Sequence, residues 1–279
     1  MGHSVRFWIG WGPDEPLDAI HCRHARPTVI LFVSDMHFGR GAPAHERDKE
    51  AALIDCLEAH AGGVEHLYLV GDVFDGYIEY RHLVPKGMVR FQALLARWTD
   101  RGVPVTYLAG NHDPWHRDYF STELGVRFVS DALDTTHQGL RLHLVHGDAQ
   151  ASSHGLYPWL RPLLRHPLAA RLYRSVLPAD WGLGLARWVS RRLHDEQPDP
   201  TVIRALQSHA RTHLAQNGTD AVVMGHSHVP ALHTWPEGTY LNTGNWYERR
   251  TFGRLDEGTM RLQRWNGTRA VDIEAADVH

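Results

Sequence analysis

The sequence predicts an α/β fold in which two β-sheets pack back to back and helices cover their outer faces. In the first half of the chain, short apolar runs alternate with segments of helical periodicity, which is the pattern of βαβ units. In the second half, strand-like runs follow one another with one clear helical segment among them. With 279 residues, 43% hydrophobic and 22% charged, the chain has the composition of a globular protein with a sizeable core.

Three strands and two helices are expected in the first half. Residues 29–33 form a continuous apolar run, which is typical of a strand buried on both faces. Residues 66–70 and 103–108 have the same character, and we expect them to pair with the first strand in parallel. Residues 53–57 and 88–98 carry apolar side chains at helical spacing and are expected to be the connecting helices.

The second half is expected to add six short strands, at residues 140–145, 221–224, 231–235, 240–242, 260–265 and 270–273. A helix is expected within residues 202–214, where apolar residues recur at helical spacing. The domain would then span residues 28–279. Residues 1–27 show no period and are expected to form an irregular N-terminal extension.

Residues 151–196 differ in composition from the rest of the chain. They contain seven arginines, many leucines and tryptophans, and the prolines Pro162, Pro167 and Pro178, which divide the segment into short helices. We interpret the segment as a helical cap inserted into the domain.

The core strands are followed directly by polar residues of one chemical type. The ends of parallel strands meet at one edge of a sheet, where ligands bind, so these residues should converge. They are Asp35, His37, Asp72, Asn111, His146, His226 and His228. A glycine precedes Asp72, Asn111 and His226, which lets the backbone approach a crowded cluster.

The residue types indicate the class of metal. Carboxylate and amide oxygens together with imidazole nitrogens, without cysteine, suit Mn²⁺, Fe²⁺ or Zn²⁺, and we expect Mn²⁺. Seven ligands exceed the needs of one such ion and suit two ions that share a carboxylate. Two ions would bring more positive charge than Asp35 and Asp72 neutralise, so the site would attract a phosphate ester.

His112 is the one histidine in these clusters that is not among the seven expected ligands. Its neighbour Asp113 is expected to hold one ring nitrogen, which leaves the other to donate a proton to the departing oxygen. His112 and Asp113 are therefore the candidate catalytic residues. Asp75 and Asp148 suit either of two roles, as residues that orient the ligands or as turn caps.

A single histidine at such a position is more often a packed or exposed side chain than a metal ligand. Five clusters, each after an apolar strand, outweigh that alternative. The remaining histidines, among them His116, His143 and His233, keep a packing or surface role.

A known superfamily shares this pattern. Over residues 30–245 the chain resembles the calcineurin-like metallophosphoesterases in the series Asp35-x-His37, Gly71-Asp72, Gly110-Asn111-His112-Asp113, His146 and Gly225-His226-x-His228. The resemblance implies a four-layer αββα sandwich. It also implies that Asp72 bridges two metals, one held by Asp35, His37 and His228 and the other by Asn111, His146 and His226.

Within that superfamily, the chain is most similar to the UDP-2,3-diacylglucosamine diphosphatases of lipid A synthesis and their near relatives. The similar stretches are residues 71–75, the passage from His146 into the arginine-rich segment, and residues 241–246. The resemblance implies hydrolysis of the pyrophosphate of UDP-2,3-diacylglucosamine to UMP and 2,3-diacylglucosamine 1-phosphate, under a cap that shelters acyl chains. Many members carry Arg at the position of His112, whereas this chain keeps the superfamily histidine.

The composition of the cap suits a nucleotide-linked acylated sugar. Trp159 and Trp188 would help to line an apolar chamber, and Arg161, Arg165 and Arg171 would bind phosphate through forked hydrogen bonds. An arginine-rich amphipathic element with tryptophans also suits an anionic membrane surface. The alternative is a cap whose apolar faces only pack on the core.

Composition limits the other classes. A net charge of −3 provides no basic field for nucleic acid. Cys22 and Cys56 cannot build a disulfide framework. Without a spanning apolar run or a leader pattern, we expect a cytoplasmic protein, peripheral at the inner membrane surface. The sequence does not indicate an oligomeric state.

Two other functions are compatible with the pattern. A broad-specificity phosphomonoesterase or phosphodiesterase acting on soluble nucleotides would need no lipid chamber. A scaffold that has lost catalysis would be expected to lack metal ligands, and none of the seven is missing.

Overall fold

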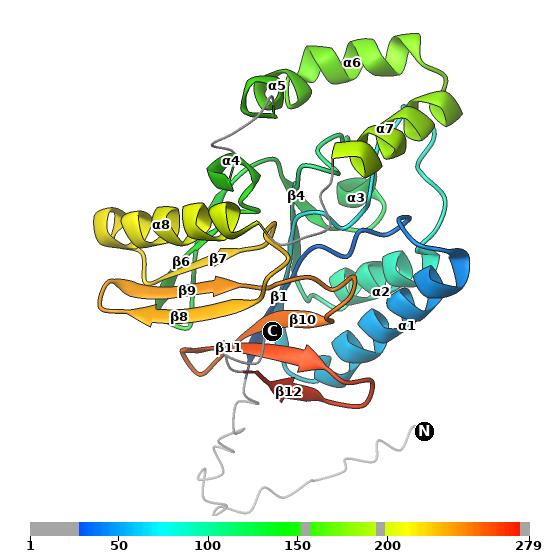
Figure 1. Cartoon of the computed structure of the whole chain (residues 1–279). Helices are drawn as coiled ribbons and strands as arrows, with labels where there is room; N and C mark the ends of the chain where they lie inside the picture. Colours follow the sequence, from blue (N-terminus) through cyan, green and yellow to red (C-terminus); the bar gives the residue numbers. More distant parts are fainter. Residues whose placement is uncertain (1–27, 152–156, 194–198, 274–279) are drawn as a thin grey trace, which may run out of the picture.

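The computed structural model describes residues 28–151, 157–193 and 199–273. Two sheets lie back to back with helices on their outer faces (Figure 1). One sheet has 7 strands in the order β12-β11-β10-β1-β2-β3-β4, and the other has 5 in the order β5-β6-β7-β9-β8. The mixed α/β architecture expected from the sequence is thus confirmed.

The first sheet contains β1 (Val29–Val33), β2 (Val64–Val70), β3 (Val105–Leu108), β4 (Arg127–Val129), β10 (Thr251–Asp256), β11 (Thr259–Trp265) and β12 (Ala270–Asp272). The second contains β5 (Leu133–His137), β6 (Leu140–Leu144), β7 (Ala221–Met224), β8 (Ala231–Trp235) and β9 (Gly238–Asn242). Strands β1 to β4 pair in parallel, as do β6, β7 and β9. Both sheets therefore have strands whose carboxyl ends point to a shared edge.

Three apolar clusters define the layers. Leu31 of β1 packs with the residues of α1 (Pro43–His60) and α2 (Val89–Asp100) on one face of the first sheet. The next residue, Phe32, points to the opposite face and joins Leu144 between the sheets, because side chains alternate along a strand. Val222 packs against α8 (Pro200–Asn217) on the outer face of the second sheet. The result is the order helix, sheet, sheet, helix.

Buried charges at the start of α1 hold the loop that follows β1. The Glu46 carboxylate accepts hydrogen bonds from the backbone N–H groups of Gly39 and Gly41, at 2.8 and 2.7 Å. The Lys49 ammonium donates to the carbonyl of His37 at 3.0 Å and to Glu46 at 3.0 Å. These bonds fix the backbone around His37, a candidate ligand.

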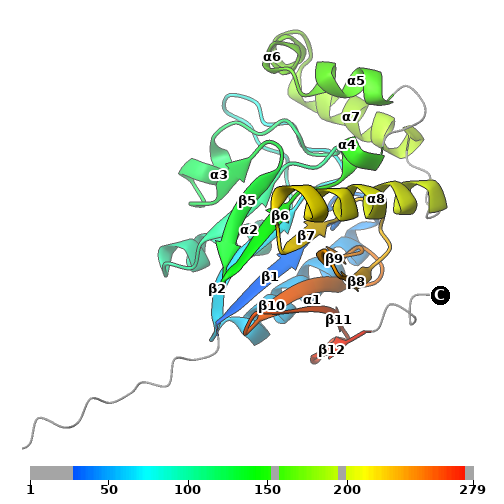
Figure 2. The same cartoon turned by 90° about the vertical axis from the view of Figure 1, so that its left-hand side faces the viewer.

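The helices α5 (Tyr157–Leu164), α6 (Pro167–Val176) and α7 (Ala179–Leu193), which we call the cap helices, lie together at one end of the molecule (Figure 1, Figure 2). Near them lie the short helices α3 (Tyr119–Thr122) and α4 (Asp148–Ala151). The indole N–H of Trp115 donates to the carbonyl of Leu164 at 2.5 Å, and the Tyr80 hydroxyl donates to that of Leu177 at 3.2 Å. Trp115 and Tyr80 follow β3 and β2, so the cap helices cover the carboxyl ends of these strands.

Three strands differ from the sequence-based expectation. Strands β4, β5 and β10 lack the apolar pattern that would predict them. Strands β4 and β5 have no fully buried residue, and Gly253 interrupts the run of large side chains in β10.

No helix in the described part of the chain is long and apolar enough to cross a membrane. Residues 1–27 lie outside that part.

Candidate metal centre

The structure brings the seven candidate ligands together where the strands end. Nε2 of His228 lies 3.3 Å from Oδ1 of Asp35 and 3.1 Å from Nε2 of His37. Asp35 and His37 follow β1 in the first sheet, whereas His228 follows β7 in the second. The first group of ligands therefore spans both sheets.

A second group lies beside the first and shares Asp72 with it. Oδ2 of Asp72 lies 3.2 Å from Nε2 of His146 and 3.9 Å from Nε2 of His37. Oδ1 of Asn111 lies 3.1 Å from Nε2 of His146 and 3.0 Å from Nδ1 of His226. Asp72 thus faces both groups, as a bridging carboxylate would.

Each of the two carboxylates has one oxygen held by the protein and one directed at the histidines. Oδ2 of Asp35 accepts hydrogen bonds from the Ser34 hydroxyl and from the His226 backbone N–H, the latter at 3.1 Å. Oδ1 of Asp72 accepts a hydrogen bond from the backbone N–H of His112 at 2.9 Å. The other oxygens, Oδ1 of Asp35 and Oδ2 of Asp72, are buried without a conventional hydrogen bond among the described residues, and they face the ring nitrogens of His228 and His146, at 3.3 and 3.2 Å. Buried carboxylate oxygens of this kind need a cation, so the residues present fit divalent metal ions.

The backbone is left-handed at five of the seven candidates. The φ angles are 51° at Asp35, 44° at His37, 51° at Asp72, 67° at His226 and 57° at His228. This conformation is strained for residues with a side chain, and it concentrates at functional sites where the surroundings enforce it. In this conformation the five side chains meet at the shared centre.

Glycines allow the loops to meet as closely as they do. A Cβ atom on Gly110 would overlap the backbone nitrogen and the carboxylate of Asp72. A Cβ on Gly225 would lie 2.5 Å from Oδ2 of Asp35. The expected close backbone approach is therefore confirmed at both positions.

The charges of the site compensate one another. Burial would raise the pKa of Asp35 and Asp72, but neighbouring histidines hold both pKa values well below the usual range. Burial would lower the pKa of His37 and His146, but nearby carboxylates raise these values to about 9 and about 10. In the metal-free protein, protons on His37 and His146 thus supply positive charge that the two carboxylates require.

Hydrogen bonds behind the ligands orient them. His146 donates from Nδ1 to the carbonyl of Val70 at 2.9 Å, so Nε2 is the ring nitrogen that faces Asp72 and would bind a metal ion after losing its proton. The amide of Asn242, just after β9, donates to the carbonyl of Gly225 at 2.7 Å and supports the loop that carries His226.

The expected pairing of His112 with Asp113 is wrong. The Asp113 carboxylate instead accepts hydrogen bonds from the Tyr107 hydroxyl and from three backbone N–H groups, among them those of Val73 at 2.7 Å and Gly110 at 2.8 Å. Two other carboxylates face the ring: Oδ1 of Asp75 lies 3.9 Å from Nδ1 of His112, and Oδ2 of Asp72 lies 3.9 Å from its Nε2. Asp113 therefore positions the loops after β2 and β3, whereas Oδ1 of Asp75 faces Nδ1 of both His37, at 3.6 Å, and His112, at 3.9 Å.

The cap arginines expected at the substrate have other partners. Arg161 and Arg165 bind the buried carboxylate of Asp148, at 2.7 and 3.2 Å, and so anchor α5 to the domain. Arg171 is exposed on α6, and Trp188 on α7 is 56% exposed. Trp159 belongs to α5, but its side chain lies outside the described part of the structure.

Sequence reasoning did not select Arg187, which the fold places beside the site loops. Its Nη2 lies 3.3 Å from the position that a Cβ would take on Gly39, and its Cγ lies 3.3 Å from the corresponding position on Gly76. These glycines stand close to His37 and Asp75 in the chain. Arg187 is one of seven arginines in its segment, and only the fold distinguishes it from the others.

The cap helices expose an unusual amount of apolar surface. Of the 13 exposed large hydrophobic side chains among the residues whose burial is described, nine belong to them. The nine are Leu163, Leu164, Leu168, Leu172, Val176, Trp181, Leu185, Trp188 and Val189. These side chains leave apolar surface of the cap helices available for a ligand.

Comparison with known proteins gives consistent results. The model of the calcineurin-like phosphoesterase family matches residues 28–230. A UDP-2,3-diacylglucosamine hydrolase of Porphyromonas gingivalis is 30% identical over 258 residues, which cover 85% of this chain and 97% of the relative. Another, from Nitrosococcus oceani, is 30% identical over 236 residues, with 84% and 90% covered. Among solved structures, the phosphoesterase Yfce from E. coli is similar, with a TM-score of 0.46 and 17% identity over 89% of this chain and 100% of that one.

Proposed function

Because this chain belongs to the calcineurin-like phosphoesterase family and is a metal-dependent hydrolase, we propose that it hydrolyses the pyrophosphate of UDP-2,3-diacylglucosamine to UMP and 2,3-diacylglucosamine 1-phosphate. Relatives that carry the name of this activity align with most of the chain. The observation that carries the proposal is the exposed apolar surface of the cap helices beside a cluster of metal-ligand types. A soluble phosphoester would not need that surface.

Two divalent ions, Mn²⁺ in our proposal, fit the cluster. Asp35, His37 and His228 would hold one ion, Asn111, His146 and His226 would hold the other, and Asp72 would bridge them. When bound, such a pair supplies positive charge for phosphoryl oxygens and an activated water near neutral pH.

His112 is the proposed proton donor to the departing group. Its Nδ1 lies 3.9 Å from Oδ1 of Asp75, and its Nε2 lies 3.9 Å from Oδ2 of Asp72. Burial lowers the pKa of His112 to about 4 in the metal-free protein, so the ring would carry its second proton, as Nε2–H toward the site, only when the negative charge of the bound substrate raises that pKa. Removal of the Nε2 proton by the departing oxygen would then restore the neutral ring.

Arg187 and the cap leucines are the proposed substrate contacts. The guanidinium of Arg187 lies over the loop at Gly39, where it would bind a phosphate of the substrate, and the Cγ of the same side chain lies over Gly76. Leu168 and Leu172, 63% and 66% exposed, would shelter acyl chains. The same surface would let the protein take its substrate from an anionic membrane.

The test is incubation of the purified protein and Mn²⁺ with UDP-2,3-diacylglucosamine, with UMP measured by chromatography. The proposal predicts equal amounts of UMP and the acylated sugar phosphate, and none after treatment with EDTA. Hydrolysis of soluble nucleotides without release of UMP from the lipid substrate would overturn the proposal and favour a broad-specificity phosphoesterase.

A further inference from the structure

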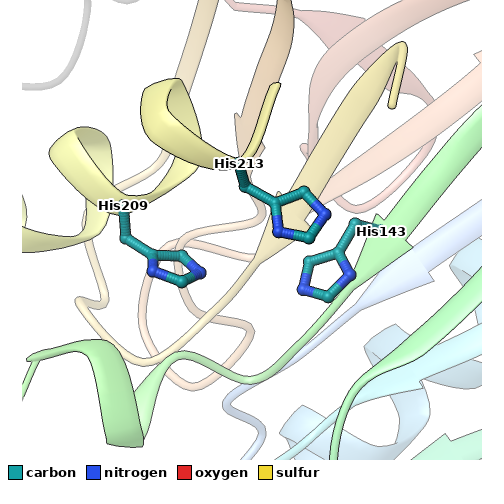
Figure 3. Close-up of side chains that lie close together, drawn as sticks. All are labelled: His143, His209 and His213. Atoms are coloured by element: carbon teal, nitrogen blue, oxygen red, sulfur yellow. The ribbon is translucent and has the colours of Figure 1, made fainter. Parts of the chain in front are cut away.

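A second group of histidines lies away from the strand ends. His143 belongs to β6, and His209 and His213 belong to α8. One ring nitrogen from each lies within 4.8 Å of the others. Figure 3 shows the imidazoles of His209 and His213 descending from the helix toward that of His143 on the strand. We call these three residues the α8 histidine cluster.

The secondary structure explains why the three side chains meet. On β6, Leu142 and Leu144 face the apolar layer between the two sheets. His143 lies between them in the strand, so its side chain points to the opposite face, toward α8. His209 and His213 are four residues apart in a helix and share one side of it. The arrangement therefore depends on regular elements and not on loop conformation.

A carboxylate orients the strand histidine. Oδ1 of Asp134, the residue paired with His143 across β5 and β6, lies 2.6 Å from Nδ1 of His143. An ionised carboxylate only accepts hydrogen bonds, so Nδ1 donates and the lone pair is on Nε2. Histidines that bind metals commonly have a carboxylate on the other ring nitrogen in this way.

The helix histidines also have the properties of ligands. Nε2 of His209 is buried and has no hydrogen-bond partner among the described residues. Burial and the neighbouring His143 lower the pKa of both His209 and His213. The lowered pKa values favour the neutral rings, and neutral imidazole is the form that binds metal ions.

We propose that His143, His209 and His213 form a further metal site, which takes Zn²⁺ or a similar borderline ion through three imidazoles and leaves a fourth position open. Three histidines with no oxygen ligand among them favour such an ion over Mg²⁺ or Ca²⁺. The cluster shares no residue with the candidate metal centre. It joins α8 to the outer face of the second sheet.

Metal entry requires only local movement. The rings of His143 and His213 now stack with their centroids 3.8 Å apart and 26° between their planes. They have to tilt apart so that one ion, about 2.0–2.1 Å from each nitrogen, lies in the plane of both rings. An open pocket of about 490 Å³, with Asp134 and His213 in its lining, gives solvent access to the site.

The first experiment compares zinc binding by the metal-free full chain and by its His209→Gln variant. We expect the variant to bind one zinc equivalent fewer in equilibrium dialysis and to gain less thermal stability from added Zn²⁺, because binding to the folded site stabilises the native state. The His233→Gln variant is the matched control, since His233 contacts Gln207 of α8 at 3.1 Å but lies outside the cluster. It should bind as much zinc as the unmodified protein. Equal zinc binding by all three proteins would overturn the proposal.

The second experiment keeps the three ligands and changes the residue that orients one of them. Co²⁺ in a tetrahedral imidazole site absorbs visible light, so it reports on the site directly. The Asp134→Asn variant should bind this Co²⁺ about 10- to 100-fold more weakly. The same Co²⁺ affinity in Asp134→Asn and in the unmodified protein, or no tetrahedral spectrum in either, would contradict the proposal.

Discussion

Nε2 of His146 lies 3.2 Å from Oδ2 of Asp72, and the two residues follow strands of different sheets. The candidate metal centre is therefore also a place where the two sheets meet, in addition to the apolar layer between them. A change at Asp72 should affect metal binding, catalysis and the junction of the sheets together.

Replacement of Asp72 by Asn removes the charge that both groups of ligands share. We expect kcat to fall by at least about 100-fold and the protein to hold less Mn²⁺, because the bridging carboxylate is lost. Elemental analysis and UMP release measure the two effects. Asp100→Asn, at the exposed end of α2, is the control and should leave both quantities unchanged. Full metal content in Asp72→Asn would contradict the bridging role.

A methyl group at Gly110 should disrupt the site because a Cβ there would overlap Asp72. We expect Gly110→Ala to lower the free energy of unfolding by about 1–3 kcal/mol and to reduce activity. Gly184→Ala is the matched control. Gly184 lies in α7, and apart from its own helix backbone and chain neighbours no described atom lies within 4 Å of its added Cβ, so that variant should gain up to about 1 kcal/mol. Urea unfolding separates the two cases, and an equally stable Gly110→Ala would refute the close approach.

Serine at Leu172 should reduce hydrolysis of the acylated substrate specifically. The side chain is 66% exposed on α6, so its loss should cost little stability but should weaken contact with acyl chains. We expect kcat/KM for the lipid substrate to fall about 10- to 100-fold, since a buried leucine contributes about 1.5–3 kcal/mol. Turnover of a small aryl phosphate should not change. Leu83→Ser, 60% exposed outside the cap helices, is the control, and an equal loss in both variants would exclude acyl binding by the cap.

His116 should make the stability of the protein sensitive to acid. Its ring nitrogens are buried without hydrogen-bond partners among the described residues, and burial together with the charge of Arg174 lowers its pKa well below 6.5. As the pH falls below 6.5, the unfolded chain takes up a proton that the folded protein does not, so the free energy of unfolding falls.

The variant His116→Phe tests that effect. It should be more stable than the unmodified protein at pH 5, by a margin that grows from pH 7 to pH 5 by up to about 1.4 kcal/mol per pH unit. Urea unfolding at each pH measures the margin. Histidines at the metal centre contribute equally to the pH dependence of the free energy of unfolding in both proteins, so their contribution cancels in the difference. A margin that stays constant with pH would contradict the assignment.

Elements with a strong apolar pattern could be predicted from the sequence. Strands β1, β2 and β7 are wholly or mostly buried, and their apolar runs reveal them. Strand β5 could not be predicted, because its residues are at most partly buried. The start of α1 could not be predicted either. The helix begins at Pro43, but Glu46, Lys49 and Glu50 fill buried positions in its first turns, so the apolar pattern appears only later in the helix.

The candidate ligands could be predicted because polar residues at strand ends converge in any parallel arrangement. Their supporting partners could not, since they depend on how the loops fold. Asp113 is adjacent to His112 in sequence, yet its carboxylate turns toward Tyr107 and Gly110, and Asp75 faces the ring. The pairing of Arg161 and Arg165 with Asp148 likewise requires the position of α5 over the domain.

The central claim is that ligands from both sheets hold two ions that share Asp72. Electron paramagnetic resonance of the protein with two equivalents of Mn²⁺ tests it most directly, because ions about 3.5–4 Å apart couple magnetically. The account predicts the spectrum of a coupled Mn²⁺ pair, which is lost in Asp72→Asn. A spectrum of isolated Mn²⁺ ions alone would contradict it.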